Sequence, residues 1–163
     1  MEPMTTALTT RRTPSWLTLV PFVAAVTVVA VLGGLAAGSA GQTYRNLELP
    51  PFAPPSWLFG PVWSVLYLMI AVAGWLVWRA RGWDRALTLW VVQLVLNALW
   101  TPLFFAADLY VAALVDIALL LLAVSATIVL FRRTSTLAAW LLVPYLAWVG
   151  FATALTAGIV VLN

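Results

Sequence analysis

Five long apolar segments divide this chain, and they constrain its fold more than any other feature. Each can cross a hydrocarbon core roughly 30 Å thick as a helix of about 20 residues. They lie at residues 16–38, 60–78, 86–105, 109–131 and 137–162. Soluble domains typically carry about 25% charged residues, whereas this chain carries 8% and has a mean hydropathy of +1.06. We therefore predict an all-α integral membrane protein, a bundle of five transmembrane helices that forms a single domain over residues 1–163.

The basic residues are unevenly divided between the two sides of this predicted bundle. Five spans put the N-terminus on the same side as the second and fourth connections, and that side carries Arg11, Arg12, Arg79, Arg81, Arg85, Arg132 and Arg133. The other side carries only Arg45. Because cytoplasmic connections are enriched in basic residues, we expect the N-terminus inside and the C-terminus outside. The expected location is the cytoplasmic membrane of a bacterium, with the outer membrane as the alternative.

A cleaved signal peptide is the rival interpretation of the first segment. Arg11 and Arg12 precede its apolar run, and small residues follow it. That run exceeds 20 residues, however, whereas the apolar region of a signal peptide has about 7–15. We therefore interpret the segment as a membrane span.

Cysteine and histidine are both absent from the sequence. Their absence excludes disulfides, thiolate nucleophiles, His-based catalytic triads and the usual zinc and haem-iron ligands. No phosphate-binding loop or nucleophile elbow is present either. We predict no catalytic residue, no metal site, no required cofactor and no nucleic-acid partner, and expect the lipid bilayer as the surroundings.

The long connection between the first and second spans is rich in proline and tryptophan. Residues 50–67, PPFAPPSWLFGPVWSVLY, contain five prolines, two tryptophans and two phenylalanines. Because proline fixes φ and holds the chain extended, we expect this connector to keep a fixed shape over a cavity.

Unusual side chains of four spans lie at a similar predicted depth beneath that connector, since each helical residue advances 1.5 Å. Trp63 and Tyr67 share a face of the second span. The third span carries a polar and aromatic stripe at i, i+4, i+7 and i+11, and the fifth carries an aromatic group. These residues are Gln93, Asn97, Trp100 and Phe104 in the third span and Trp148, Phe151 and Leu155 in the fifth. The pattern predicts an aromatic cleft in the outer half of the membrane, although core packing and interhelical hydrogen bonds are the alternatives.

Asp116 lies at the same predicted depth in the fourth span. An aspartate inside a span costs about 2.5–3.5 kcal/mol on insertion scales and usually faces a cavity or a partner. No basic residue lies within a span to pair with it, so it is protonated, hydrated or bonded to groups such as Asn97. A functional or gating role and a buried capping role both stay open.

Small residues recur at four-residue spacing in two spans. The first span has Ala30, Gly34 and Gly38, and the fifth has Gly150, Ala154 and Gly158. Such stripes let helix backbones approach closely. We expect them to be packing seams within the bundle.

Five stretches of the chain form a recognisable series: TLVP at 18–21, the connector at 50–67, QLVLNALWTPLFF at 93–105, ALVD at 113–116 and VPYLAWVGFATAL at 143–155. With these stretches the sequence resembles the TspO/MBR family, the translocator and tryptophan-rich sensory proteins, along nearly its full length. The resemblance implies a five-helix bundle, often a homodimer, with an outer-half pocket for tetrapyrroles. Protoporphyrin IX and haem are the expected ligands. In a chain without His or Cys the iron of haem would rely on Tyr or Met, so a metal-free macrocycle is as plausible a ligand as haem.

The resemblance also implies which residues form the pocket. They are Trp63, Asn97, Trp100, Trp148, Phe151, Ala152 and Leu155, with Trp57 and Phe59 at the junction that covers it. Asp116 joins this set from the depth argument above. The chain departs from the family at Phe52, where tryptophan is usual, and at Thr156, where asparagine is usual. No basic residue follows Tyr145 in the sterol-recognition pattern, which makes sterol a less favoured ligand.

The function expected from this resemblance is a membrane receptor or carrier for porphyrin-type ligands, acting in stress or tetrapyrrole homeostasis. One alternative is a light- and oxygen-dependent enzyme that degrades porphyrin with Trp63 and Trp148 as redox partners. The other is a non-catalytic assembly or regulatory subunit of the membrane.

Overall fold

The computed structural model of the protein describes residues 15–38 and 40–163. All regular elements within them are helical. Five helical stretches are long and apolar enough to cross a membrane: Trp16–Ala36, Ser56–Arg81, Arg85–Ala106, Tyr110–Arg132 and Thr136–Leu162. The predicted all-α fold with five spans is confirmed, with ends that differ by a few residues. Arg11 and Arg12 lie outside the described residues.

The described residues form seven α-helices and three shorter helical turns. The α-helices are α1 (Val20–Ala36), α2 (Ala40–Asn46), α3 (Phe59–Arg81), α4 (Arg85–Thr101), α5 (Tyr110–Arg132), α6 (Thr136–Leu141) and α7 (Val143–Leu162). The turns are Ser15–Leu19 before α1, Ser56–Leu58 before α3 and the π-helical turn Pro102–Ala106 after α4. Only α2 lies outside the five spans.

Local sequence sets several of the helix ends. The α3 helix stops at Gly82, whose φ of 72° is unfavourable for other residues and whose N–H donates to the carbonyl of Trp78. Asp84 caps α4 by accepting from the N–H of Leu87 at 3.1 Å. The fifth span is divided into α6 and α7 at Leu142, because Pro144 has no N–H to continue the helical hydrogen bonds.

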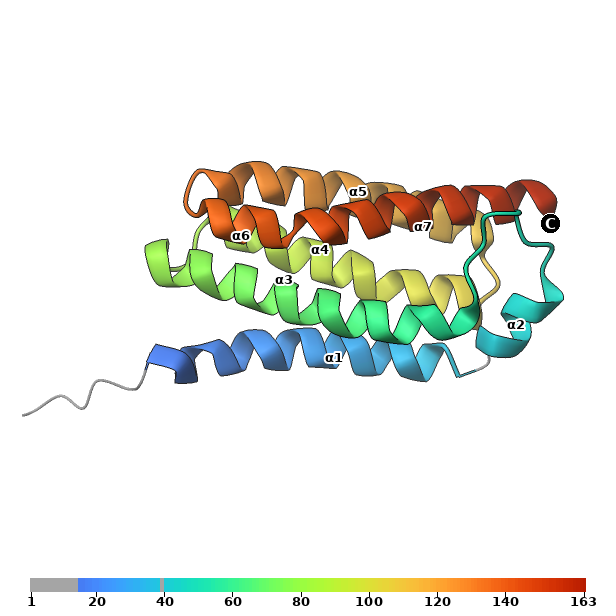
Figure 1. The fold of residues 1–163 in the computed structure, drawn as a ribbon, viewed down its shortest axis with the longest axis horizontal. Coiled ribbons are helices and arrows are strands. Elements are labelled where there is room, and N and C mark those ends of the chain that lie inside the picture. Colours follow the sequence, from blue (N-terminus) through green and yellow to red (C-terminus); the bar gives the residue numbers. More distant parts are fainter. Residues whose placement is uncertain (1–14, 39) are drawn as a thin grey trace, which may run out of the picture.

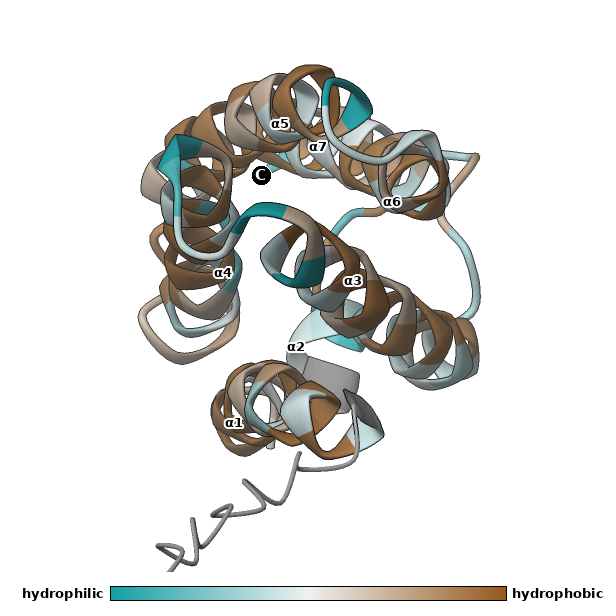
Figure 2. Ribbon diagram, turned by 90° about the vertical axis from the view of Figure 1, so that its left-hand side faces the viewer, coloured by the Kyte–Doolittle hydropathy of each residue, from teal (hydrophilic) through white to brown (hydrophobic). Residues whose placement is uncertain are grey.

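The helices are arranged around α3 and α4 (Figure 1). The α5 helix packs against α4 and α7, whereas α1 packs against α3 and α4 on the opposite side. Figure 2 shows that separation end-on and the apolar residues along the helices. Of the described arginines, Arg79, Arg81, Arg85, Arg132 and Arg133 lie at one end, which we call the arginine end, and Arg45 lies at the other.

The arginine end of the bundle is filled by large rings. Phe22 of α1 lies against Trp90 of α4 and Trp78 of α3, with ring centroids 5.5 and 6.0 Å apart. The Trp90 indole donates to the carbonyl of Ile70 at 3.0 Å. Gly74 admits this indole, since a Cβ there would lie 2.7 Å from Trp90 Cε2. These contacts hold α1, α3 and α4 together in this half of the bundle.

The connector is less extended than the sequence predicted. Only residues 47–55 are without helix, and we call this stretch the strap. The short helix α2 precedes the strap, and helical structure resumes at Ser56. Proline is tolerated in the first turn of a helix, where its missing N–H has no partner to lose, so Pro61 does not delay the start of α3.

Two glycines of the predicted packing seams, one in the first span and one in the fifth, have surroundings that differ from the prediction. A Cβ on Gly34 would meet no atom within 4 Å, so Gly34 is not at a helix-packing seam. Gly158 is in close contact, but its neighbour is Pro50 of the strap. In both places a small residue borders a feature other than a neighbouring helix.

Candidate functional site: an aromatic cavity beneath the strap

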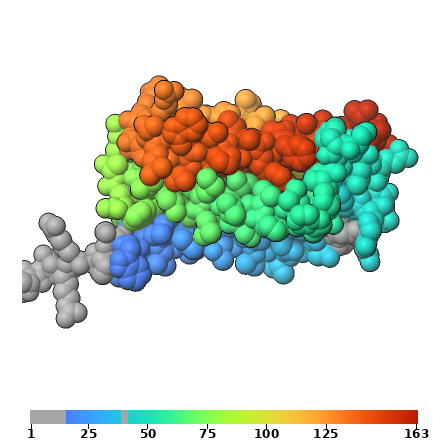
Figure 3. All heavy atoms as spheres, viewed as in Figure 1, coloured from blue at the N-terminus to red at the C-terminus, as the bar shows by residue number. Residues whose placement is uncertain are grey.

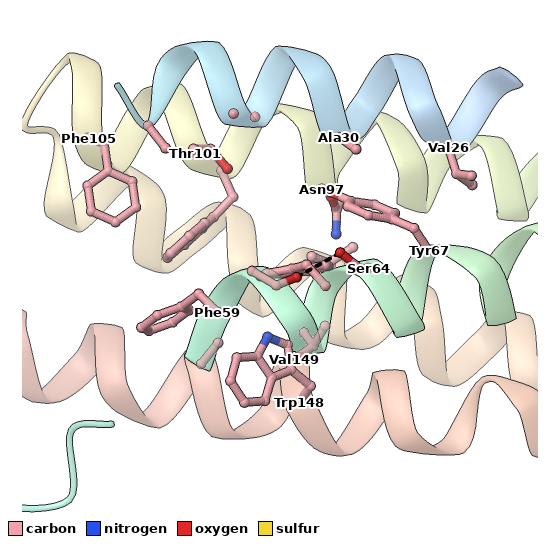
Figure 4. A pocket seen from close by; sticks show the side chains of 18 of the residues that line it. Val26, Ala30, Phe59, Ser64, Tyr67, Asn97, Thr101, Phe105, Trp148 and Val149 are labelled. Atoms are coloured by element: carbon pink, nitrogen blue, oxygen red, sulfur yellow. Dashed lines mark hydrogen bonds between the residues drawn. The ribbon is translucent and has the colours of Figure 1, made fainter. Parts of the chain in front are cut away.

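A cavity of about 750 Å³ lies inside the bundle near the strap. Its walls come from α1, α3, α4, α5 and α7, with Tyr44 of α2 and Trp57 at the strap side. Figure 4 shows Tyr67 and Asn97 between α1 and α3, with Phe59 and Trp148 on the α7 side. Pockets that hold small molecules usually measure about 300–1,000 Å³, so this space is large enough for one ligand.

The α1 wall of the cavity is built from small residues. Ala30, Gly33, Gly34 and Ala37 all line it. The Cβ position of Gly33 is 3.5 Å from Thr101 Oγ1, and that of Gly34 is open. The absence of side chains at the two glycines leaves room along this part of the wall.

The opposite walls carry aromatic rings in defined pairs. Trp63 stacks on Tyr67 with centroids 5.2 Å apart, and its edge meets Tyr145 at 6.1 Å. Trp148 meets Phe59 edge to face at 5.8 Å. Such pairs restrict ring rotation and contribute about 0.5–1.5 kcal/mol each beyond buried area. The cavity therefore presents rings that are already oriented.

A chain of hydrogen bonds fixes the main polar group of the cavity, the Asn97 amide. The Tyr67 hydroxyl donates to Asn97 Oδ1 at 2.8 Å, and Asn97 Nδ2 donates to the Tyr145 hydroxyl at 3.0 Å. Tyr145 in turn donates to Gln93 Oε1 at 2.8 Å. Tyr67 and Asn97 line the cavity, whereas Tyr145 and Gln93 are buried behind it.

Four buried polar side-chain atoms have no hydrogen-bond partner among the described residues. Two are the indole nitrogens of Trp100 and Trp148, whose side chains line the cavity. The others are Gln93 Nε2 and Asp116 Oδ2. Asn97 bonds to two tyrosines, and no hydrogen bond joins it to Asp116 Oδ2. A bond between these two residues was one of the alternatives that the sequence left open.

The cavity wall contains no charged residue. Across the described residues, no group of three or more His, Cys, Asp or Glu side chains lies close enough to hold a metal ion. Its chemistry is that of an apolar, aromatic site with a few neutral hydrogen-bonding groups. Such a site suits a flat apolar molecule and offers it donors at the edges.

Comparison with known proteins agrees with this architecture. A family model described as the TspO/MBR family matches residues 22–162. The chain belongs to the TspO/MBR family. It is 41% identical to the tryptophan-rich protein TspO of Archaeoglobus fulgidus over 150 residues, which cover 90% of this chain and 97% of the relative. It is 38% identical to the human translocator protein over 148 residues, or 87% of this chain and 88% of that protein.

A bacterial relative is similar to this TspO/MBR protein over a comparable length. The tryptophan-rich sensory protein of Cereibacter sphaeroides is 36% identical over 140 residues, which are 86% of this chain and 87% of the relative. All three matches extend over nearly the whole membrane domain. The family identified from the sequence is thereby confirmed.

The structure brings most of the predicted site residues of this TspO/MBR protein to the cavity. The following predicted residues line it: Trp57, Phe59, Trp63, Asn97, Trp100, Trp148 and Ala152. Trp57 is 70% exposed, so it borders the cavity from outside. Residues from the junction before α3 and from three separate helices therefore meet at one space.

Three predicted residues lie away from the cavity wall. Leu155 lines a small adjoining apolar recess. Phe151 lies behind the wall, with its ring 5.6 Å from that of Trp148. Asp116 is buried in α5, 7% exposed, but is not part of the wall.

The TspO/MBR cavity also includes residues that the predicted site omitted. Thr101, Phe105, Tyr44 and the small residues of α1 all line it. The adjacent Gly33 and Gly34 were a sequence signal for an open wall, but a glycine pair is equally compatible with helix packing. Tyr44 belongs to α2, a short helix for which the sequence shows no periodic apolar pattern.

Proposed function

We propose that this TspO/MBR protein is a membrane receptor or carrier that binds a porphyrin-type tetrapyrrole in the cavity beneath the strap. The observation that carries the proposal is the convergence of Trp63, Trp100 and Trp148, from three helices, on one uncharged cavity of about 750 Å³. A flat macrocycle offers large π-faces to such rings. The indole N–H groups of Trp100 and Trp148 are buried and lack acceptors among the described residues, so a rotation of either ring would let it donate to oxygen atoms at the macrocycle edge.

Replacement of two of these rings tests the proposal. Trp63→Phe combined with Trp148→Phe is expected to weaken protoporphyrin IX binding by roughly five- to hundredfold, since each aromatic pair contributes about 0.5–1.5 kcal/mol. Titration followed in the porphyrin absorbance bands measures this without depending on the number of tryptophans. Trp83→Phe is the matched control, because Trp83 is 66% exposed at the arginine end. Equal affinity of the double variant and the control would refute the site.

Light-dependent degradation of the bound porphyrin is a second candidate. Trp63 and Trp148 line the same cavity, so oxidisable rings would flank a macrocycle bound there, and Tyr67 and Tyr145 lie against Trp63. The oxidant would be dioxygen, excited by light through the porphyrin. An absorbance time course under illumination, compared with a dark sample and a protein-free sample, decides this. The absence of a protein-dependent product excludes degradation.

We also propose that the arginine end faces the cytoplasm and the strap faces outward. Five of the six described arginines support this orientation under the positive-inside rule. The chain contains no cysteine, so single substitutions such as Gln42→Cys and Thr136→Cys report sidedness cleanly. An impermeant thiol reagent added to intact cells should label the first and spare the second. The reverse pattern would invert the proposed topology.

We also propose that the protein forms a homodimer. This proposal rests on the family resemblance alone. Mass spectrometry of the protein released from lipid nanodiscs is expected to show two copies. A monomer at all protein concentrations would remove the dimer from the proposal without affecting the cavity.

A further inference from the structure

A pair of hydrogen bonds holds the strap to the C-terminal end of α7. The backbone N–H of Glu48 donates to Asn163 Oδ1 at 3.0 Å, and Asn163 Nδ2 donates to the carbonyl of Glu48, also at 3.0 Å. The same Nδ2 donates to the carbonyl of Ile159 at 3.0 Å, which holds the amide against the helix. The Asn163 side chain thus joins the backbone of the strap to the backbone of α7.

A close apolar contact lies beside this pair. Pro50 is buried, and its Cγ and Cβ would lie 3.1 and 3.3 Å from a Cβ on Gly158. The Phe52 ring, next along the strap, meets Phe151 of α7 edge to face at 6.3 Å. The Glu48–Asn163 hydrogen bonds are exposed, so water can replace them, whereas the Pro50–Gly158 contact is apolar and buried and offers water no hydrogen bond. Figure 3 shows the strap lying against this end of α7.

The other end of the strap is attached on the cavity side. The Tyr44 hydroxyl donates to the carbonyl of Pro54 at 3.0 Å, and its ring meets Phe59 edge to face at 5.9 Å. Burial raises the pKa of the Tyr44 hydroxyl, so it remains a donor at ordinary pH. Tyr44 and the residues just after the strap, Ser56 and Trp57, line the cavity. Movement of the strap would therefore move part of the cavity wall.

We propose that Asn163 and Gly158 are positioning residues that latch the strap in place and, through Tyr44, Ser56 and Trp57 on either side of it, set how fast ligand enters and leaves the cavity. This inference rests on the proposed porphyrin site. Neither residue lines the cavity, so neither contacts a ligand bound within it. Their effect on binding is through the closed position of the strap.

A latch has a kinetic signature that damage to the cavity does not share. If the strap must open for both entry and exit, weakening its closed state raises the association and dissociation rate constants together. The dissociation constant then changes little, because the open state is favoured equally with and without ligand. Loss of an aromatic contact in the cavity mainly speeds dissociation and so weakens affinity.

The test compares Asn163→Ala and Gly158→Leu with Val161→Ala, a control at the same end of α7 whose side chain is 85% exposed. Stopped-flow mixing with protoporphyrin IX measures both rate constants in nanodiscs. Asn163→Ala is expected to raise both by about three- to tenfold, the effect of one or two lost hydrogen bonds. Gly158→Leu, which displaces Pro50, is expected to raise them further, and Val161→Ala to leave them unchanged. Unaltered rate constants in both latch variants, or a change confined to dissociation, would overturn the latch.

Amide hydrogen exchange makes the test independent of the ligand. The Glu48 N–H is bonded to Asn163, so peptides covering residues 47–55 should exchange faster in Asn163→Ala than in wild type. In Val161→Ala they should exchange at the wild-type rate. Absence of porphyrin binding to the wild-type protein would refute the proposed function, whereas equal exchange in all variants would refute the latch. The two failures are therefore distinguishable.

Discussion

Tyr67 of α3 donates its hydroxyl hydrogen to Asn97 of α4 across 2.8 Å, which ties together two walls of the cavity. The bond leaves Asn97 Nδ2 directed to Tyr145, so both ends of this amide are held, while the second hydrogen of Nδ2 takes no part in these two bonds. A ligand in the cavity meets an asparagine whose orientation is set before binding. This lowers the ordering cost of any hydrogen bond formed with it.

The two tyrosines that bond to Asn97 should differ in their contribution to stability. Tyr145→Phe leaves both Asn97 Nδ2 and Gln93 Oε1 without a partner in the buried interior. Tyr67→Phe leaves only Asn97 Oδ1, beside a cavity that water can enter. We expect a loss of about 1–3 kcal/mol for Tyr145→Phe and less than about 1 kcal/mol for Tyr67→Phe. Thermal unfolding in detergent measures the difference, and the opposite order would contradict the network.

Two glycines provide a matched comparison of packing. A Cβ at Gly74 would lie 2.7 Å from the rigid indole of Trp90, whereas one at Gly34 would meet nothing within 4 Å. Gly74→Ala is therefore expected to destabilise the protein by about 1–3 kcal/mol, and Gly34→Ala to leave the unfolding temperature unchanged or slightly higher. Equal unfolding temperatures for the two variants would show that α3 and α4 are not packed as described.

The open wall of α1 predicts a loss of affinity without a loss of stability. Gly34→Leu should fill part of the cavity and weaken protoporphyrin IX binding at least about tenfold, while the unfolding temperature stays near that of wild type. Val31→Leu is the control, because Val31 is 54% exposed on α1 and is not part of the cavity wall. Unchanged affinity in Gly34→Leu would remove α1 from the binding site.

Asp116 should tolerate replacement by a neutral side chain of the same shape. Its Oδ2 has no hydrogen-bond partner among the described residues, and its side chain is not part of the cavity wall. Burying an unpaired carboxylate is unfavourable, so Asp116→Asn is expected to keep or raise the unfolding temperature and to keep porphyrin affinity within about threefold. A large loss of affinity would instead support the gating role that the sequence left open.

The spans and the depth of the site were predictable because both follow from counting residues. Apolar length defines the five spans, and 1.5 Å per residue sets the depth of Trp63, Asn97 and Trp148. The stripe in α4 also predicted which face of that helix turns inward, because the polar residues Gln93 and Asn97 mark one face. The structure places Asn97 and Trp100 at the cavity and Gln93 behind it.

Rotation of the other helices could not be predicted in this way. The α1 helix is apolar on all sides, so periodicity does not show which face turns inward. The same uncertainty applies to Asp116, whose depth was predicted but whose position off the cavity wall depends on the rotation of α5. The hydrogen bonds of Tyr145 were not predictable either, since they depend on where the complete fold places α7 relative to α4.

The strap shows a further limit of the sequence. Its prolines predicted a fixed shape, but the contacts that hold it come from residues far along the chain, Gly158 and Asn163. Nothing in the spacing of either residue indicates a partner in the strap. Such long-range contacts depend on the complete fold.

The central claim is that a porphyrin binds in the cavity beneath the strap. A structure of the protein in lipid nanodiscs with protoporphyrin IX bound tests it most directly. We predict a macrocycle between the Gly34 wall of α1 and the rings of Trp63, Trp100 and Trp148, with the Glu48–Asn163 bonds intact. A porphyrin bound on the lipid-facing surface or at the arginine end, with the cavity empty, would contradict this account.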